Sequence, residues 1–260
     1  MRTLLIRPLP VLVTLVVIAG WMAPKQGILD RASGSIKGDL PGGVQTGTGE
    51  FDVGTVTAVR VTGPAGLVRL SASRGGPYRA ELRSRPEGWF GFWRSNWSAG
   101  GCANAGSIRL VGTQLQVDTG NRAWFGASDC RLELDASLPE GVAVSIEQDA
   151  TSSQLSGNFA SLDVDSRAGD IALDGHARTV SIEGNAIRAR LSYARVDQDE
   201  SITLGGNAID AELRFAGAEA VNYAVSGHAS LVDSTLPNKP GVRPAIAIKG
   251  NFLRVRIGGE

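Results

Sequence analysis

The sequence repeats one stretch: SIEGNAIRARL at residues 181–191 returns as TLGGNAIDAEL at residues 203–213, an offset of 22. Both copies contain Gly-Asn-Ala-Ile, with an aliphatic residue before it and a leucine after it. A weaker relative, Ala-Gly-Asp-Ile, occupies residues 168–171. A period of about 20 residues is typical of a solenoid, in which each repeat is a coil of short strands.

The aliphatic pattern extends this repeat to residues 141–260. Aliphatic residues alternate there with small or polar ones, and glycine or asparagine falls in the gaps, where it would allow the positive φ of a tight corner. Four inward aliphatic side chains stabilise one coil by roughly 6–12 kcal/mol, whereas ordering about 20 residues costs about 30 kcal/mol. A single coil cannot fold alone, so the sequence predicts a stack in which Ile187 lies against Ile209.

We therefore expect an all-β fold, a single-domain β-solenoid preceded by an N-terminal signal or anchor helix. A β-sandwich, which spaces its strands at about 8–12 residues, is the alternative. Residues 51–140 are less regular and predict a few antiparallel strands that cap the stack. Residues 24–50 are rich in Gly, Ser and Thr and are interpreted as a linker or lead-in.

Residues 1–23 have the pattern of an export signal. Arg2 and Arg7 precede an uncharged run of 17 residues, about 25 Å as a helix against about 30 Å of hydrocarbon. This length fits a signal peptide cleaved after Ala19 or an uncleaved anchor through residues 4–23, and a buried core helix is a third reading. We expect an exported protein, periplasmic or at the cell surface, and held in the inner membrane if uncleaved.

Cys102 and Cys130 are the only cysteines, and an even number in an exported protein predicts a disulfide. Cys130 is in phase with Leu132 and Leu134, so it should point inward with them. Closing a loop of about 28 residues would stabilise the fold by about 3–4 kcal/mol. Two buried free thiols are the alternative, and the spacing does not fit a zinc site.

An aromatic insertion at residues 83–101 interrupts the strand pattern. It contains the candidate ligand-binding residues Trp89, Phe90, Phe92, Trp93 and Trp97. Such a segment either covers one end of the stack or presents an apolar tip. An exposed tip would stack on sugar rings, dock a partner or lie at a bilayer interface.

The charge balance and the few histidines give no indication of nucleic-acid binding, catalysis or metal binding. The chain has 26 basic and 26 acidic residues, a balance that gives no field for attracting nucleic acid. The only histidines, His176 and His228, lie in Gly-His-Ala contexts typical of exposed loops, and no metalloprotease, nucleophile-elbow or P-loop motif occurs. The sequence predicts no catalytic residue, no metal site and no cofactor.

Four aspartates are candidates for carbohydrate chemistry, because some β-helices act on carbohydrates. They are Asp163, Asp165, Asp170 and Asp174. Stacked coils could hold two of them about 5–10 Å apart, as glycosidic cleavage requires. Outward aspartates that alternate with inward Val or Leu are also typical of any solvated strand, which is the interpretation we favour.

Three stretches resemble a bacterial adhesin-like family. LELDASLPEGVAV lies at residues 132–144 and SRAGDIAL at residues 166–173, while VRVTGP at residues 59–64 is similar to the opening strand of the head GIN domain. The resemblance covers residues 51–260 and implies a β-helical fold on an exported or membrane-anchored protein. It implies no binding residues, because the aromatic insertion and the cysteines depart from the family pattern.

These observations favour a non-enzymatic extracytoplasmic envelope protein. It would serve as an adhesin-like scaffold or binding module for a surface partner or glycan. The first alternative is a polysaccharide-active β-helix enzyme, which aligned outward carboxylates in an aromatic groove would support. The second is a membrane-anchored accessory of an envelope sensory or assembly system.

Overall fold

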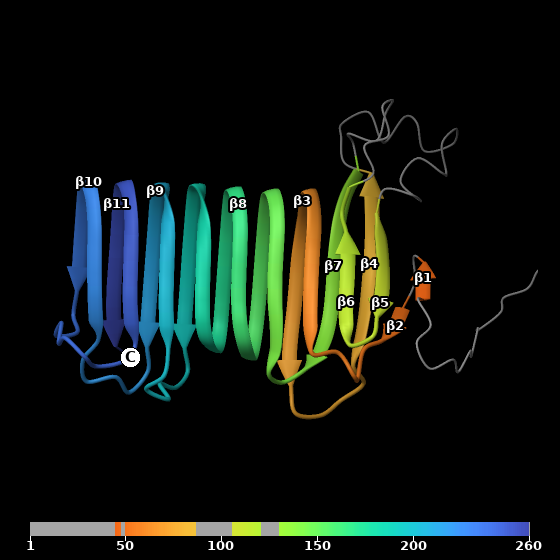
Figure 1. The fold of residues 1–260 in the computed structure, drawn as a ribbon, viewed down its shortest axis with the longest axis horizontal. Coiled ribbons are helices and arrows are strands. Elements are labelled where there is room, and N and C mark those ends of the chain that lie inside the picture. The colour runs from red at the N-terminus through yellow and green to blue at the C-terminus, as the bar shows by residue number, and fades with distance from the viewer. Residues whose placement is uncertain (1–44, 48–49, 87–105, 121–129, 260) are drawn as a thin grey trace, which may run out of the picture. The chain divides into compact units, whose positions relative to one another are not determined.

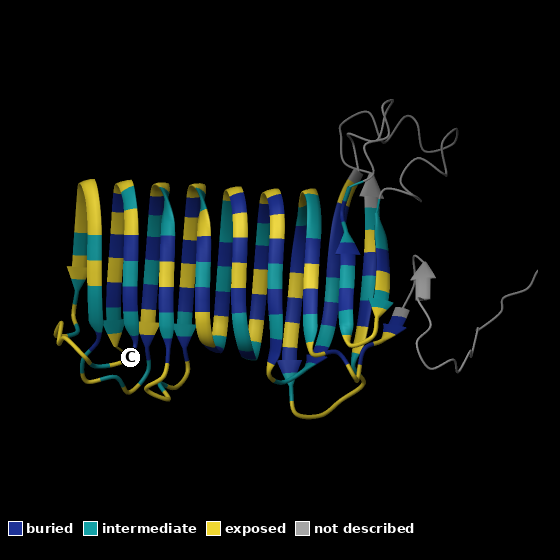
Figure 2. Cartoon of the chain, in the orientation of Figure 1, coloured by how far each residue is buried: buried dark blue, intermediate teal, exposed yellow. Residues whose placement is uncertain are grey.

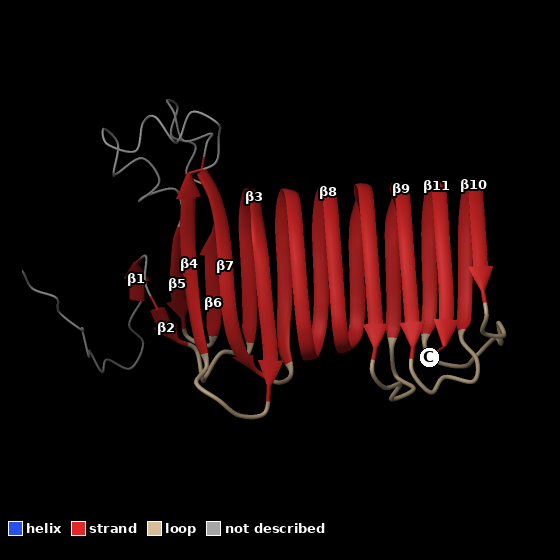
Figure 3. Ribbon diagram, turned by 180° about the vertical axis from the view of Figure 1, so that it is seen from behind, coloured by secondary structure: helices blue, strands red, loops and turns tan. Residues whose placement is uncertain are grey.

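A computed structural model describes residues 45–47, 50–86, 106–120 and 130–259. These residues all fall in one compact unit of the chain, Leu40–Glu260. Every regular element among them is a strand (Figure 3), and none of them forms a helix long and apolar enough to cross a membrane. The expected signal or anchor at residues 1–23 lies outside the described residues.

Eleven strands form one sheet. They are β1 (Gln45–Gly47), β2 (Glu50–Asp52), β3 (Ala58–Ser73), β4 (Arg79–Pro86), β5 (Ser107–Val111), β6 (Gln114–Asp118), β7 (Cys130–Pro139), β8 (Val142–Tyr193), β9 (Ser201–Phe215), β10 (Asn222–Ser234) and β11 (Ala245–Gly259). The longest, β8, winds through successive coils without a break (Figure 1). The all-β prediction is confirmed.

The coils stack in parallel, with one segment of β8 against β3 and another against β9. Ile187 lies opposite Ile209, so the offset of 22 seen in the sequence is the register between β8 and β9. Both side chains are buried. The predicted ladder is therefore confirmed. Parallel stacking also rejects the β-sandwich, whose sheets are antiparallel.

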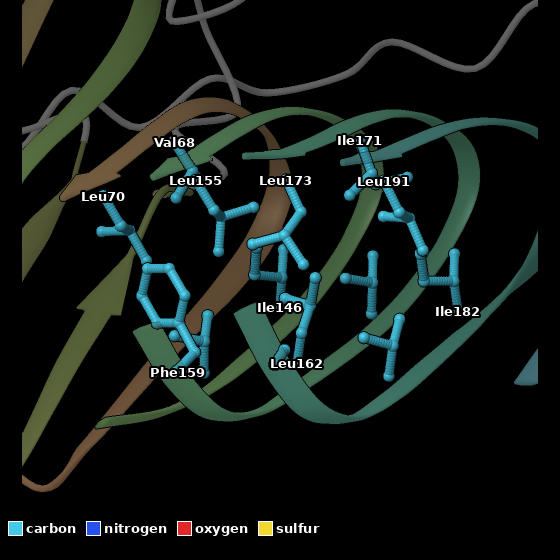
Figure 4. Packing of buried hydrophobic residues seen from close by; sticks show 14 of the residues in the cluster. Val68, Leu70, Ile146, Leu155, Phe159, Leu162, Ile171, Leu173, Ile182 and Leu191 are labelled. Atoms are coloured by element: carbon cyan, nitrogen blue, oxygen red, sulfur yellow. The ribbon is translucent and has the colours of Figure 1, made fainter. Parts of the chain in front are cut away.

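Inward side chains from the two strands of each coil meet in a continuous core. Buried and more exposed residues alternate along β3, β9, β11 and most of β8 (Figure 2), as the pleat of a strand requires. In close-up, Ile146 and Leu162 come from one side of successive coils, and Leu155 and Leu173 from the other (Figure 4). Each fully buried side chain of this size stabilises the fold by about 1.5–3 kcal/mol.

Gly157 and Gly175 have the positive φ that the sequence predicts for corners, 98° and 140°, but the glycines of the Gly-Asn pair do not. Gly184, Gly206 and Gly250 stack at one corner, and none has a positive φ. A Cβ on Gly206 would lie 2.2 Å from the carbonyl oxygen of Gly184, and one on Gly250 would lie 2.2 Å from that of Gly206. Close approach of successive backbones, not backbone conformation, therefore requires glycine here.

The asparagines beside these glycines form an amide ladder along the stack. Asn207 Nδ2 donates to Asn185 Oδ1 at 3.0 Å, and Asn251 Nδ2 donates to Asn207 Oδ1 at 2.8 Å. Each amide can donate to one neighbour and accept from the next. The recurring Gly-Asn pair therefore stabilises stacking between coils, and its asparagines have no positive φ.

At the N-terminal end of the stack the sheet divides into two arms at β3. The first half of β3 pairs with parallel β6, and β6 pairs with antiparallel β5. The second half pairs with parallel β7, and β7 pairs with antiparallel β4. Antiparallel strands thus cap the stack as expected. The sequence did not reveal that β3, far upstream of β8, forms a coil of the stack itself.

The C-terminal end of the stack is out of chain order. The final strand, β11, lies between β9 and β10 and pairs in parallel with both (Figure 1). Among the described strands β10 pairs with β11 alone, and most of its residues are exposed. Its outward Leu231 is 64% exposed. β10 therefore forms the open end of the stack.

Candidate functional site

A groove of about 1000 Å³ crosses the outer face formed by the second strand of the coils. It extends from β4 over β7, β3 and β8 to β9. At about 4.8 Å per strand, this corresponds to a length of roughly 30 Å. It is lined by Arg69, Leu70, Ser71, Arg79, Asp135, Ala136, Ser137, Gln154, Leu155, Ser156, Ala172, Leu173, Asp174, Arg190, Leu191, Ser192, Tyr193, Ala194, Glu212 and Arg214.

The groove is hollow because small outward residues coincide in register. Ser71 lies opposite Ser137 on one side and Ser156 on the other, since β3 pairs with both β7 and β8. Their neighbours along each strand point into the core. Arg79 lies opposite Ser137, and Arg190 lines the groove farther along the stack, where β8 pairs with β9. Serines and arginines therefore add polar groups to a groove whose lining also contains leucines, alanines and a tyrosine.

Ion pairs hold some of these arginines in place. Arg190 Nη2 lies 2.8 Å from Asp170 Oδ1, and Arg214 Nη2 lies 2.6 Å from Glu212 Oε1. Exposed pairs of this kind add at most about 1 kcal/mol each. A guanidinium carries five N–H donors, so each arginine keeps donors for a ligand after pairing. The groove thus offers oriented donors and hydroxyls on a nearly neutral surface.

The carboxylates that line the groove belong to Asp135, Asp174 and Glu212. Asp135 lies 3.7 Å from both Arg69 and Arg83 and so forms ion pairs with two arginines. Of the four candidate aspartates, only Asp174 lines the groove, whereas Asp163 is exposed on the other strand of its coil.

The predicted aromatic site lies outside the described residues. This applies to Trp89, Phe90, Phe92, Trp93 and Trp97 and also to Cys102. Cys130 is the first residue of β7 and pairs in register with Pro86 of β4. The disulfide and the aromatic contact therefore stay predictions.

The environment of His176 differs from the sequence expectation. The sequence predicts an exposed loop for His176, but the residue is only 7% exposed and its Nε2 lies 3.2 Å from Glu200 Oε1. Its ring also packs edge-on against Tyr193, at 5.9 Å between centroids. No local motif could have revealed this contact, because 24 residues separate His176 from Glu200.

Tyr193 connects this buried histidine with the end of the groove. Its hydroxyl donates to the carbonyl oxygen of Ala177 at 3.2 Å, and its ring lies 5.2 Å from that of Phe215. Burial raises the pKa of the Tyr193 hydroxyl, and the nearby Glu200 carboxylate raises this pKa further. The hydroxyl is therefore a neutral donor at physiological pH.

The fold and the groove define a parallel β-solenoid with a long groove on one face. No family model and no curated protein match the chain, so the finer resemblance to the head GIN domain gains no support. Two solved structures are similar to it, both designated "putative": a cell adhesion protein from Clostridium sporogenes and an adhesin from Bacteroides fragilis.

The Clostridium structure has 8% identity and a TM-score of 0.42, covering 85% of this chain and all of its own. The Bacteroides structure has 11% identity and a TM-score of 0.44, covering 83% of this chain and 97% of its own. Such a distant likeness carries no argument about function, because one fold serves many activities.

Proposed function

We propose that this chain is a non-enzymatic, exported binding module, adhesin-like in role, that holds an extended glycan in the groove. The observation that carries the proposal is the groove itself, which continues across β4, β7, β3, β8 and β9. A linear ligand can follow such a channel over several strands. Serine hydroxyls and arginine N–H groups are suited to sugar hydroxyls and carboxylates. Export rests on the pattern of residues 1–23.

Binding of purified polysaccharides to the full chain tests this proposal. We would use dextran as a neutral probe and polygalacturonate as an acidic one, with affinity electrophoresis as the readout. Ser156→Ile fills the channel and Arg190→Ala removes a donor, so each should weaken binding at least tenfold. Ser181→Ile is the matched control, since Ser181 lies in the other strand of a β8 coil and outside the groove.

Two results would reject the groove as the binding site. One is the absence of binding to either probe, and the other is equal weakening by Ser156→Ile and Ser181→Ile. The aromatic residues 89–97 are a proposed second contact. Replacing Trp89, Trp93 and Trp97 together by Ala would reduce binding only if that contact contributes.

A further inference from the structure

A loop between β8 and β9 places a carboxylate inside the protein. Glu200, the residue before β9, is fully buried. Its Oε1 accepts a hydrogen bond from the backbone N–H of Asp197 and lies 3.2 Å from His176 Nε2. Burial of a carboxylate is expensive unless the charge is compensated. The contacts of its second oxygen therefore matter.

Glu200 Oε2 has no hydrogen-bond partner and is inaccessible to solvent. Within the described part of the chain, no arginine or lysine forms an ion pair with this carboxylate. Arg243 Nη1 comes near, but it donates to the backbone carbonyl of Glu200 at 3.2 Å. A buried oxygen without a partner costs about 1–3 kcal/mol, and more where it carries charge. Such an oxygen indicates a missing positive ligand.

Further donor atoms lie close to this carboxylate. One ligand atom each from His176, Asp199 and Glu200 lies within 4.8 Å of the other two. Asp197 Oδ2 is 3.6 Å from His176 Nε2 and supplies a fourth atom. Between the two aspartates, Gln198 has φ 63°, an uncommon conformation for a residue other than glycine.

The charges of the two aspartates are already engaged at the protein surface. Arg195 Nε lies 3.1 Å from Asp197 Oδ2, and Arg178 Nε lies 2.8 Å from Asp199 Oδ2. These arginines compensate the exposed carboxylates but make no ion pair with Glu200. A bound cation would therefore compensate the buried carboxylate of Glu200.

We infer that His176, Asp199 and Glu200 bind a divalent metal ion, with Asp197 as a further ligand. One imidazole nitrogen with carboxylate oxygens suits Zn²⁺, whereas Ca²⁺ prefers six to eight oxygens. Ligand bonds of about 2.0–2.2 Å in a tetrahedron place donor atoms about 3.3 Å apart. The separation of 3.2 Å between His176 Nε2 and Glu200 Oε1 already meets this requirement.

The ion would join the loop to the preceding coil. His176 follows the second strand of one coil, while Asp199 and Glu200 precede the first strand of β9. Tyr193 packs on His176 and also lines the groove. Metal binding would therefore fix the loop at one end of the groove. The site stands on its own contacts and does not depend on glycan binding.

Titration of the full chain tests the site. The chain would be stripped of metal with EDTA and titrated with ZnCl2, and separately with CaCl2, in a calorimeter. We expect one Zn²⁺ per chain and preference for Zn²⁺ over Ca²⁺. His176→Gln and Glu200→Gln should each weaken Zn²⁺ binding at least tenfold. His228→Gln, which alters the exposed histidine of β10, is the matched control and should leave the affinity unchanged.

Thermal unfolding gives a second readout. Excess Zn²⁺ should raise the Tm of the unaltered chain by several degrees and leave the Tm of His176→Gln unchanged. If Glu200→Gln does not fold, Asp199→Asn changes a ligand whose side chain is 48% exposed and should weaken binding instead. Absence of Zn²⁺ binding, equal affinity in all ligand variants, or preference for Ca²⁺ would overturn the inference.

Discussion

At the corner of each coil, single atoms decide whether successive turns of chain can stack. The carbonyl oxygen of Gly184 occupies the space where a Cβ on Gly206 would lie. The preceding residue, Gly205, has open space, because a Cβ there would meet only the Glu183 side chain at 3.6 Å. Neighbouring glycines therefore differ sharply in what they tolerate.

We expect Gly206→Ala to destabilise the protein by about 1–3 kcal/mol, as overpacking against backbone usually does. Gly205→Ala is the control and should change the free energy of unfolding by less than about 0.5 kcal/mol. Urea denaturation monitored by far-UV circular dichroism measures both. Equal losses in the two variants would show that contact with the neighbouring backbone is not the reason for glycine.

The sequence contains part of this residue-scale information. The Gly-Asn pair correctly predicts a corner, but for the wrong reason, namely positive φ. The distance between the backbones of successive coils cannot be inferred from a single segment of sequence. The floor of the groove was missed for a related reason. Ser71, Ser137 and Ser156 align only through pairing of β3 with β7 and β8, and no local pattern reports that register.

Among the elements, β10 depends on β11 for its place in the stack, whereas β11 does not depend on β10. β11 contacts β9 directly, whereas β10 reaches the stack only through β11 within the described strands. The sequence revealed the coil of β9 through its shared Gly-Asn-Ala-Ile. In β11 the residue opposite Ala208 is Phe252, so the same motif is broken and the order of pairing could not be predicted.

Truncation tests this dependence. A chain ending at residue 244 keeps β10 but loses β11, and a chain ending at residue 221 loses both. We expect the two truncated chains to unfold at the same urea concentration, because β10 has no coil to pair with once β11 is absent. A lower midpoint for the shorter chain would mean that β10 packs on the stack independently.

Taken as a whole, the stack is a one-dimensional array in which each coil contacts its neighbours. Stability in such an array is the sum of coil and interface contributions, so end coils open more easily than central ones. β8 lies between β3 and β9, and β10 lies at the open end (Figure 2). Opening free energies should therefore differ along the axis.

Native-state hydrogen exchange measures this gradient. Amides of residues 222–234 should exchange at least tenfold faster than those of residues 179–193, which are paired on both sides. A protein that opened as one unit would show equal protection in both segments and would contradict this view of the stack.

The position of β11 also affects how such a protein could lengthen in evolution. Where coils follow chain order, duplication of the last coil simply adds another turn at the end. Here both edges of β11 are already occupied, by β9 and by β10. A duplicate inserted after β11 would have to cross β10 to find a free edge. Growth by gene duplication should therefore favour the interior of β8, where each new coil meets neighbours in sequence order.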